Sequence, residues 1–242
     1  MIFLFYLKKF LLQSQKDKMN KIEIVKSEVS KILWREKSGH DYLHVFRVYN
    51  MAMQFCITES DADKDIVGFA ALLHDCDDLK IFTPSEDKFP NANRIMDLAN
   101  IDHVTRTYII DIIDTISFSK TLSGIHPQNI NGWIVSDADK CDAIGSTGII
   151  RVIQFGTSKN RAIWDPKIAP IAQDDKSYYQ YDKSTTINHF FEKLLLVKNL
   201  MFANAGRREA ELRHKMMVDF LRQFFIENNA LEWIKMLDNL KA

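Results

Sequence analysis

The chain has 242 residues, 46% of them hydrophobic and 26% charged, which is typical of a globular protein and not of a disordered or fibrous one. Lys and Arg together number 32, as do Asp and Glu, so the near-zero net charge argues against a protein that coats a polyanion, while leaving room for a local basic pocket. The 3 cysteines form no Cys-x-x-Cys pair, which predicts a reducing, cytoplasmic location without a disulfide framework.

Residues 1–18 differ from the rest of the chain. Their apolar run is interrupted by Lys8 and Lys9, so it is too short to span a bilayer, and it lacks the cleavage site of a secretory signal. Met19 begins a polar sequence that favours a helix start. We expect residues 1–18 to be an extension upstream of a natural start at Met19, with a weak amphipathic membrane contact as the alternative. We expect residues 19–242 to form one domain.

Apolar residues recur at spacings of three and four along almost the whole chain, a pattern that predicts helices. The predicted helices cover residues 20–36, 41–57, 61–73, 91–99, 102–116, a segment from about Asn131, 146–155, 187–204, 206–227 and 230–240. Asp61 is the predicted N-cap of the third helix. No segment alternates between apolar and polar residues as a strand would, so we predict an all-α fold.

Four potential metal ligands occur in the order His44, His74, Asp75 and Asp139. Two imidazoles and two carboxylates suit a divalent ion such as Mn, Mg, Fe, Co, Ni or Zn, and phosphate chemistry, better than thiolate chemistry. A single His or Asp on a helix is most often a surface residue. The pair His74–Asp75, however, ends the apolar run that begins at Val67, and a carboxylate buried there is costly unless it is paired or bound to metal.

Each predicted helix that carries a ligand also carries a second polar group three residues after a ligand, which places both on one helix face. These groups are Arg47 after His44, Asp78 after Asp75, and Asp142 after Asp139. Arg47 could hold a phosphate or a carboxylate. Asp78 could act as a general acid or base. Asp142 could orient a ligating histidine.

The order His, His-Asp, Asp on helices resembles the HD superfamily of metal-dependent phosphohydrolases. A closer similarity is to a bacterial subgroup that includes nucleotide pyrophosphohydrolases. The motifs that carry it are Gly39-His40-Asp41-x-x-His44-x-x-Arg47-Val48, Ala71-Leu72-Leu73-His74-Asp75, Asp137-Ala138-Asp139-x-x-Asp142-Ala143-Ile144-Gly145 and Ile187-Asn188-His189-Phe190-x-Glu192-Lys193-Leu194-Leu195. The similarity spans roughly residues 20–228.

The resemblance implies an all-α fold with C-terminal helices packed on the core, and a single metal ion. The implied ligands are His44, His74, Asp75 and Asp139. Asp137 is the alternative to Asp139, which is preferred because the Ala-Asp step of the family falls on Ala138-Asp139. Asp78 falls where related phosphohydrolases carry a catalytic acid, but here the residue is Asp and not Glu. A second metal ion is not expected, because no further histidine is evident near the motifs.

Basic residues near these motifs are predicted to contact substrate. Lys80 and Lys140 would neutralise phosphate charge together with Arg47, with a solvated helix end as the alternative for both lysines. His189 and Lys193 lie four apart on the predicted helix 187–204 and would line the substrate cleft, the alternative being a core helix with a polar outer face. The pair His40-Asp41 could orient a ligand, or Asp41 could cap a helix.

The subgroup implies hydrolysis of a nucleoside triphosphate to a monophosphate and pyrophosphate. One alternative is a nucleotide phosphomonoesterase or phosphodiesterase. Another is a non-catalytic domain that senses nucleotides and keeps a structural metal. The expected partner is a small phosphate compound, with neither a nucleic-acid polymer nor a membrane, and an oligomer is possible.

Overall fold

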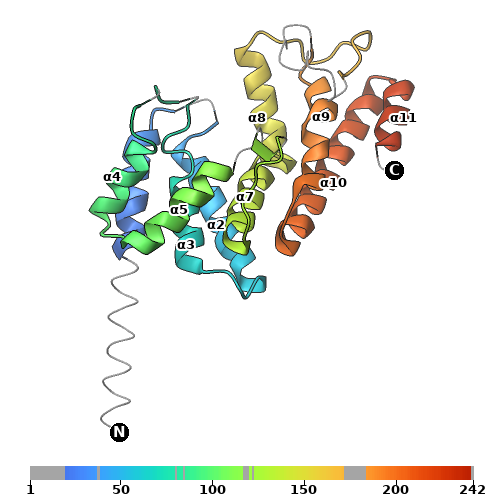
Figure 1. Ribbon diagram of the computed structural model, residues 1–242. Helices are drawn as coiled ribbons and strands as arrows, with labels where there is room; N and C mark the ends of the chain where they lie inside the picture. The colour runs from blue at the N-terminus through green and yellow to red at the C-terminus, as the bar shows by residue number, and fades with distance from the viewer. Residues whose placement is uncertain are drawn as a thin grey trace. The chain divides into compact units, whose positions relative to one another are not determined.

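The structure is a computed structural model that describes residues 20–36, 39–79, 81–83, 85–116, 120–121, 123–171 and 184–240 (Figure 1). The expectations for residues 1–18 and for Lys80 lie outside the described residues. Every element of the described residues is a helix, and none is a strand, which confirms the all-α prediction. The chain divides into two compact units, Met1–Val135 and Ser136–Ala242, which are described separately.

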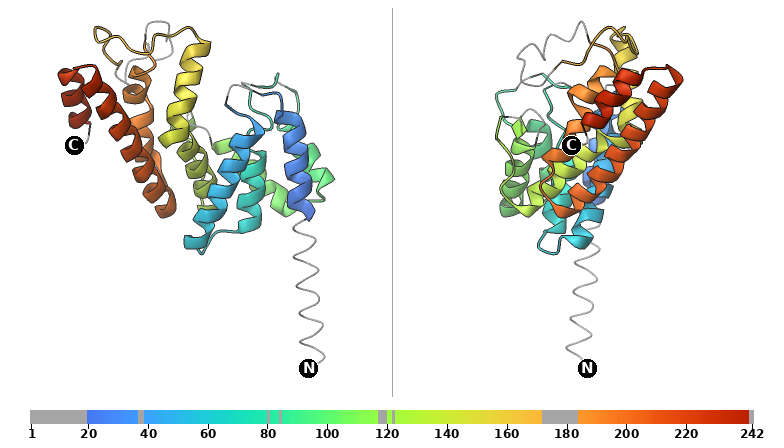
Figure 2. Two further views of the ribbon diagram at one scale, coloured as in Figure 1. Left: turned by 180° about the vertical axis from the view of Figure 1, so that it is seen from behind. Right: turned by 90° about the vertical axis from the view of Figure 1, so that its right-hand side faces the viewer.

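The first unit is built around a central apolar helix. Its elements are a helix over 20–33, α2 Tyr42–Thr58, α3 Lys64–Leu73, α4 Pro90–Leu98, α5 His103–Thr115 and the first part of α7 Ile130–Asp142. All residues of α3 from Val67 to Leu73 are buried, and a helix that is apolar all round needs neighbours on several sides. It packs against both α2 and α5 (Figures 1 and 2).

Aspartates cap three helices of this unit. Asp41 accepts a hydrogen bond from the His44 N–H at the start of α2, and Asp102 accepts one from the Thr105 N–H at the start of α5. At α3 the predicted cap, Asp61, is wrong: the cap is Asp63, whose carboxylate accepts from the N–H groups of the second and third helical residues. The helix starts at Lys64, so Asp63 directly precedes it, whereas Asp61 lies too far before it to cap its first N–H groups.

The second unit contains the C-terminal helices. They are the last part of α7, α8 Gly145–Ser158, α9 Asn188–Glu192, the 3-10 helix η3 Leu194–Leu200, α10 Asn204–Glu227 and α11 Leu231–Asn239. The long helix α10 packs against α8, η3 and α11. An aromatic cluster joins α9, α10 and α11, with ring centroids 5.7 Å apart for Phe191 and Trp233 and 5.5 Å apart for Phe225 and Trp233.

The single helix predicted over 187–204 is wrong. The α-helix ends at Glu192, Lys193 leaves the helical conformation, and the chain continues as η3. Glu192 is buried and accepts hydrogen bonds from the Ser184 hydroxyl (2.7 Å) and the Ile171 N–H (3.1 Å), which anchors the end of α9. A 3-10 helix places residues three apart on one side, which buries Leu194 and Val197 together.

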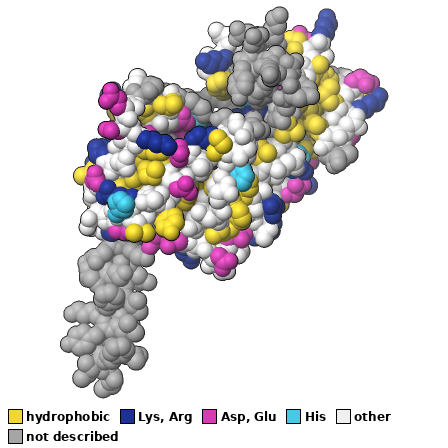
Figure 3. Space-filling model, in the orientation of Figure 1, with side chains coloured by type: hydrophobic (Ala, Val, Ile, Leu, Met, Phe, Trp, Pro, Cys, Tyr) yellow, Lys and Arg dark blue, Asp and Glu magenta, His cyan; other side chains and the backbone are white. Residues whose placement is uncertain are grey.

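The surface carries charges of both signs (Figure 3) and the cysteines are free, as the composition predicts. Basic and acidic side chains are interspersed on the face drawn in Figure 3. In the part of the chain that the structure describes, no helix has the length and apolarity that a membrane crossing requires. Cys56, Cys76 and Cys141 are all buried and free. Burial raises the pKa of each thiol, to about 11 for Cys56 and further for the other two.

Candidate metal centre

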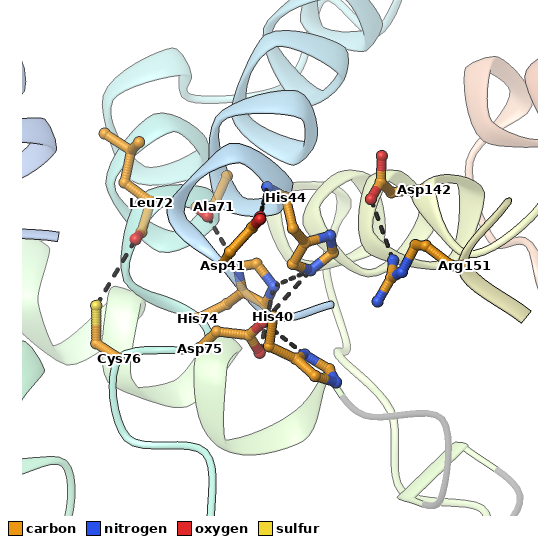
Figure 4. A network of polar contacts seen from close by, with 10 residues as sticks. All are labelled: His40, Asp41, His44, Ala71, Leu72, His74, Asp75, Cys76, Asp142 and Arg151. Carbon is orange, nitrogen blue, oxygen red and sulfur yellow. Dashed lines mark hydrogen bonds and ion pairs between the residues drawn. The ribbon is translucent and has the colours of Figure 1, made fainter. Parts of the chain in front are cut away.

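The first turn of α2 positions His44. Asp41 caps the helix by accepting from the His44 N–H at 2.8 Å, so the backbone of this histidine is fixed by its own helix start. The imidazole is only 1% exposed and points inward (Figure 4). Arg47 lies one turn further along α2 and is half-buried. The predicted capping role of Asp41 is therefore present in the structure.

His74 and Asp75 lie just beyond the helix that precedes them. The α3 helix ends at Leu73, His74 is its C-cap, and residues 74–77 form a turn. The expectation that Asp75 and Asp78 share a helix face is therefore wrong. Asp78 is half-buried, and its N–H donates to the Asp75 carbonyl at 3.3 Å. The turn allows adjacent side chains to point to one place, which two neighbours on a regular helix do less easily.

Three side chains of the first unit converge (Figure 4). The Nε2 atoms of His44 and His74 are 3.3 Å apart. The Asp75 carboxylate lies 3.3 Å from His44 Nε2 and 3.5 Å from His74 Nε2. Two ligand atoms at 2.0–2.2 Å from one ion lie about 2.8–3.1 Å apart at an octahedral angle of 90° and about 3.3–3.6 Å apart at a tetrahedral angle, so these separations fit one shared divalent cation.

The hydrogen bonds of His74 determine which ring nitrogen can bind a cation. Its Nδ1 lies 2.9 Å from the Ala71 carbonyl oxygen, which can only accept, so Nδ1 carries the proton. Nε2 is then a lone-pair donor that faces His44 and Asp75. A ligating histidine held through its other nitrogen by a backbone carbonyl is the usual arrangement at metal sites. The donor set of this unit therefore fits a metal ion.

His40 supports the carboxylate from the other side. Its Nδ1 donates to Asp75 Oδ2 at 2.8 Å, and the two residues form a further potential ligand group with His44. This contact agrees with the predicted role of His40 in orienting a ligand. Burial raises the pKa of Asp75, but the nearby His74, with hydrogen bonds from His40 and His44, outweighs burial and holds the pKa well below its usual range.

Asp139 lies on α7 in the second unit, between two residues that fix the helix in place. Asp137 is fully buried and accepts hydrogen bonds from the N–H groups of Phe202 (3.0 Å) and Ala203 (2.7 Å), where the chain enters α10. Arg213 of α10 donates to the Cys141 carbonyl at 2.9 Å. Both Asp137 oxygens are thus engaged with backbone, whereas Asp139 is half-buried.

Lys140 and Asp142 are buried and paired within the second unit. The Lys140 ammonium donates to the Ser136 hydroxyl and lies 5.1 Å from the centre of the Phe202 ring. Burial lowers the pKa of Lys140, while Asp137 and Asp139 favour its charged form. Asp142 accepts from Arg151 at 3.2 Å (Figure 4). Lys140 is therefore not the solvated helix end that was its alternative interpretation.

His189 and Lys193 lie at the two ends of α9. Both are half-buried. Burial lowers the pKa of His189 to about 3, and the positive charges of Lys193 and Arg161 add to that effect. The imidazole of His189 is therefore neutral over the physiological pH range. Its side chain lies near the positive charges of Lys193 and Arg161. Their contact with substrate remains a prediction.

A comparison with known proteins identifies the family. The family model of the HD domain matches residues 41–144, which include all four predicted ligands. The protein YpgQ of Bacillus subtilis (strain 168) is 32% identical over 206 residues, covering 85% of this chain and 92% of that protein. The chain belongs to the HD family. HD domains bind divalent metals, and this HD protein is a metal-dependent phosphohydrolase.

Solved structures support the same assignment. An HD-superfamily hydrolase from Bacillus thuringiensis is 33% identical, covers 88% of this chain and 99% of its own, and has a TM-score of 0.68. The structure of Bacillus subtilis YpgQ in complex with ADP is 27% identical, covers 87% of this chain and 96% of its own, and has a TM-score of 0.69. The similarity thus extends over nearly the whole length of these relatives.

Proposed function

We propose that this HD phosphohydrolase acts on nucleotides and cleaves a nucleoside triphosphate to a monophosphate and pyrophosphate. The observation that carries the proposal is the ADP bound to YpgQ, a relative whose sequence aligns with 85% of this chain. ADP combines a base, a sugar and a phosphate chain, so a related site with basic residues suits the same class of compound. The cleavage position follows from the subgroup that the motifs resemble.

We propose that His44, His74, Asp75 and Asp139 hold one divalent metal ion. The convergence of the first three supports their part in the site. Asp139 is favoured over Asp137 because the Asp137 carboxylate already accepts backbone hydrogen bonds. When bound, the ion supplies a polarised phosphoryl oxygen and a water of lowered pKa. Nitrogen and oxygen ligands suit Mn, Mg, Co, Ni, Fe or Zn.

The remaining roles fall to side chains near these ligands. We assign Asp78 to orient or deprotonate the attacking water, because it follows Asp75 in the same turn. We assign Arg47, one turn from His44, to neutralise charge that develops on the phosphate. We also assign phosphate or nucleotide contacts to a basic group that consists of Lys80, Lys140, His189 and Lys193.

The test is a panel of nucleoside tri-, di- and monophosphates incubated with each of Mn, Mg, Co and Ni, with products separated by chromatography. We expect monophosphate and pyrophosphate from a triphosphate. His74→Ala and Asp75→Ala should each lower the rate by about a hundredfold or more, because charge stabilisation by a metal amounts to several kcal/mol. His103→Ala is the matched control, since His103 is exposed on α5.

The products separate the alternatives. Inorganic phosphate released without pyrophosphate would select the phosphomonoesterase interpretation. Metal and nucleotide binding without turnover would select the sensing domain. Full activity in both His74→Ala and Asp75→Ala would contradict the proposed metal site, whichever product forms.

A further inference from the structure

The start of α4 lacks a cap of its own. Phe89 precedes the helix in a left-handed conformation (φ 58°) and makes no side-chain cap. A non-glycine residue in this region is strained by roughly 1–2 kcal/mol, so surrounding contacts must hold it there. Pro90 follows as the first helical residue and has no N–H. The N–H groups of Asn91 and Ala92 therefore need acceptors from elsewhere in the chain.

Asp77 provides both acceptors. Its Oδ1 accepts from the Asn91 N–H at 2.9 Å, and its Oδ2 accepts from the Ala92 N–H at 2.9 Å. The carboxylate thus acts as the cap of a helix that begins 13 positions later in the sequence. A negative charge at this end also interacts favourably with the helix dipole.

A side chain of α4 adds a third hydrogen bond to the same turn. The Asn91 side-chain amide donates to the Cys76 carbonyl at 3.0 Å. Two consecutive residues, Cys76 and Asp77, are therefore bound to the first turn of α4 by three hydrogen bonds. We call this arrangement the Asp77–Asn91 clasp. Cys76 directly follows Asp75, so the clasp holds the backbone next to the predicted ligands.

The backbone hydrogen bonds within the turn itself are local. It lies beyond the regular hydrogen bonds of α3, and its own short-range backbone bonds include Cys76 N–H to Leu73 carbonyl (3.1 Å) and Asp78 N–H to Asp75 carbonyl (3.3 Å). His40 and His44 contact the Asp75 side chain, but without a contact to another helix the backbone that follows Asp75 would be held by these local bonds alone. The clasp fixes the other side of the turn to a second helix.

We propose that Asp77 and Asn91 are positioning residues that hold the His74–Asp75 turn in the geometry required for metal binding. The inference rests on the proposed ligand set. It assigns Asp77 a role different from that of its neighbour Asp78, which we place at the attacking water. It also makes α4, which carries none of the ligands, part of the machinery that sets metal affinity.

The decisive experiment compares Asn91→Ala with Asn93→Ala by calorimetric titration of the full chain with Mn²⁺. Both asparagines lie in the first turn of α4 and donate from the side chain to a backbone carbonyl, Asn91 to Cys76 and Asn93 to Lys88 (3.1 Å). We expect Asn91→Ala to weaken binding by roughly tenfold or more, as loss of an outer-shell partner does, and Asn93→Ala to leave it unchanged.

A second pair controls for the loss of a helix cap. Asp77→Ala and Asp102→Ala each remove an aspartate cap, from α4 and α5 respectively. Both should lower the melting temperature, but only Asp77→Ala should weaken Mn²⁺ binding, by roughly 10- to 100-fold. Hydrogen exchange of the metal-free protein supplies a readout apart from activity, since residues 74–78 should exchange faster in Asp77→Ala and Asn91→Ala alone.

The outcomes separate this inference from the proposed function. If the parent binds Mn²⁺ and His74→Ala does not, while both clasp variants bind as the parent does, the clasp is only a structural cap and the inference is wrong. If His74→Ala binds Mn²⁺ as tightly as the parent, the ligand assignment itself is wrong. Equal weakening by Asn91→Ala and Asn93→Ala would show that α4 stability alone sets the affinity, which also overturns the inference.

Discussion

Asp75 shows how a single carboxylate can be buried beside an apolar helix. Desolvation disfavours its charge, but its oxygens lie near three imidazoles, those of His40, His44 and His74. Each ring offers a partner that a solvated carboxylate would otherwise find in water. The charge of Asp75 is thereby retained in a buried place, which is what binding a cation from solution requires.

His189 offers a test at the scale of one residue. Its folded pKa of about 3 lies below the ordinary value of 6.5. Between these values the unfolded chain binds a proton at this position and the folded chain does not, so stability falls as the pH falls from about 6.5 toward 3. The loss should be at most about 1.4 kcal/mol per pH unit. Urea unfolding at several pH values should show a flatter profile for His189→Gln than for the parent.

His103→Gln is the control for this measurement, because His103 is an exposed histidine for which the same profile as the parent is expected. If His189→Gln and the parent lose stability in parallel below pH 6.5, the imidazole of His189 is accessible and titrates normally. Its burial near the positive charges of Lys193 and Arg161 would then have to be rejected.

At the scale of elements, α7 and α10 hold each other at both ends of their contact. Asp137 of α7 accepts from the two N–H groups that precede α10, and Arg213 of α10 donates to a carbonyl near the end of α7. Gly206 makes this possible, because a Cβ at that position would lie 2.2 Å from Asp137 Oδ2. The carboxylate cannot move away without losing its hydrogen bonds.

Gly206→Ala should therefore destabilise the protein by about 1–3 kcal/mol, as overpacking does, although alanine is the better helix former. Thermal unfolding measures the effect. In Asp137→Ala the same substitution should cost much less, because the obstructing atoms are gone, and a double-mutant cycle gives the coupling. Strictly additive effects of Gly206→Ala and Asp137→Ala would show that the predicted clash does not occur.

Local patterns in the sequence predict the helices well, and nonlocal contacts explain where they fail. The caps Asp41 and Asp102 act on their own helices, so both belong to a local signal. The break at Lys193 depends on how Glu192 is held by Ser184 and by the backbone of another segment, which no periodicity records. Apolar spacing alone continues through this point as a single helix.

Some residues of the candidate site can be predicted from the sequence, and others depend on contacts between distant segments. The ligands His44, His74 and Asp75 stand out because metal-binding residue types occur in a recognisable order. Nothing in the sequence marks Asp77 or Asn91, since an acidic residue in a turn and an asparagine after a proline are both common. Their pairing depends on the approach of α4 to the turn after α3, which is a tertiary contact.

At the scale of the whole molecule, binding of the proposed metal ion should stabilise the folded chain, because the ion binds the folded state and not the unfolded one. Metal at about 100 times its dissociation constant should then add about 2.7 kcal/mol of stability to the folded chain. For a chain of this size that corresponds to a rise in melting temperature of roughly 5–10 °C. Calorimetric scans with Mn²⁺ and with EDTA measure the difference.

Asp139→Asn tests whether Asp139 belongs to the set of metal ligands. We expect the difference between the Mn²⁺ and EDTA scans to shrink to a small fraction of the parent value in this variant. An unchanged difference would remove Asp139 from the ligand set.

The three buried thiols can be used to measure how often each unit opens, because each thiol lies within one unit. Cys56 and Cys76 belong to the first unit and Cys141 to the second, and burial keeps all three protonated and out of contact with solvent. An alkylating reagent can reach them only when the surrounding helices separate. Cys76 adjoins Asp75 and Cys141 lies two residues after Asp139, so the alkylation rate of each thiol would measure how often the helices around that proposed ligand separate.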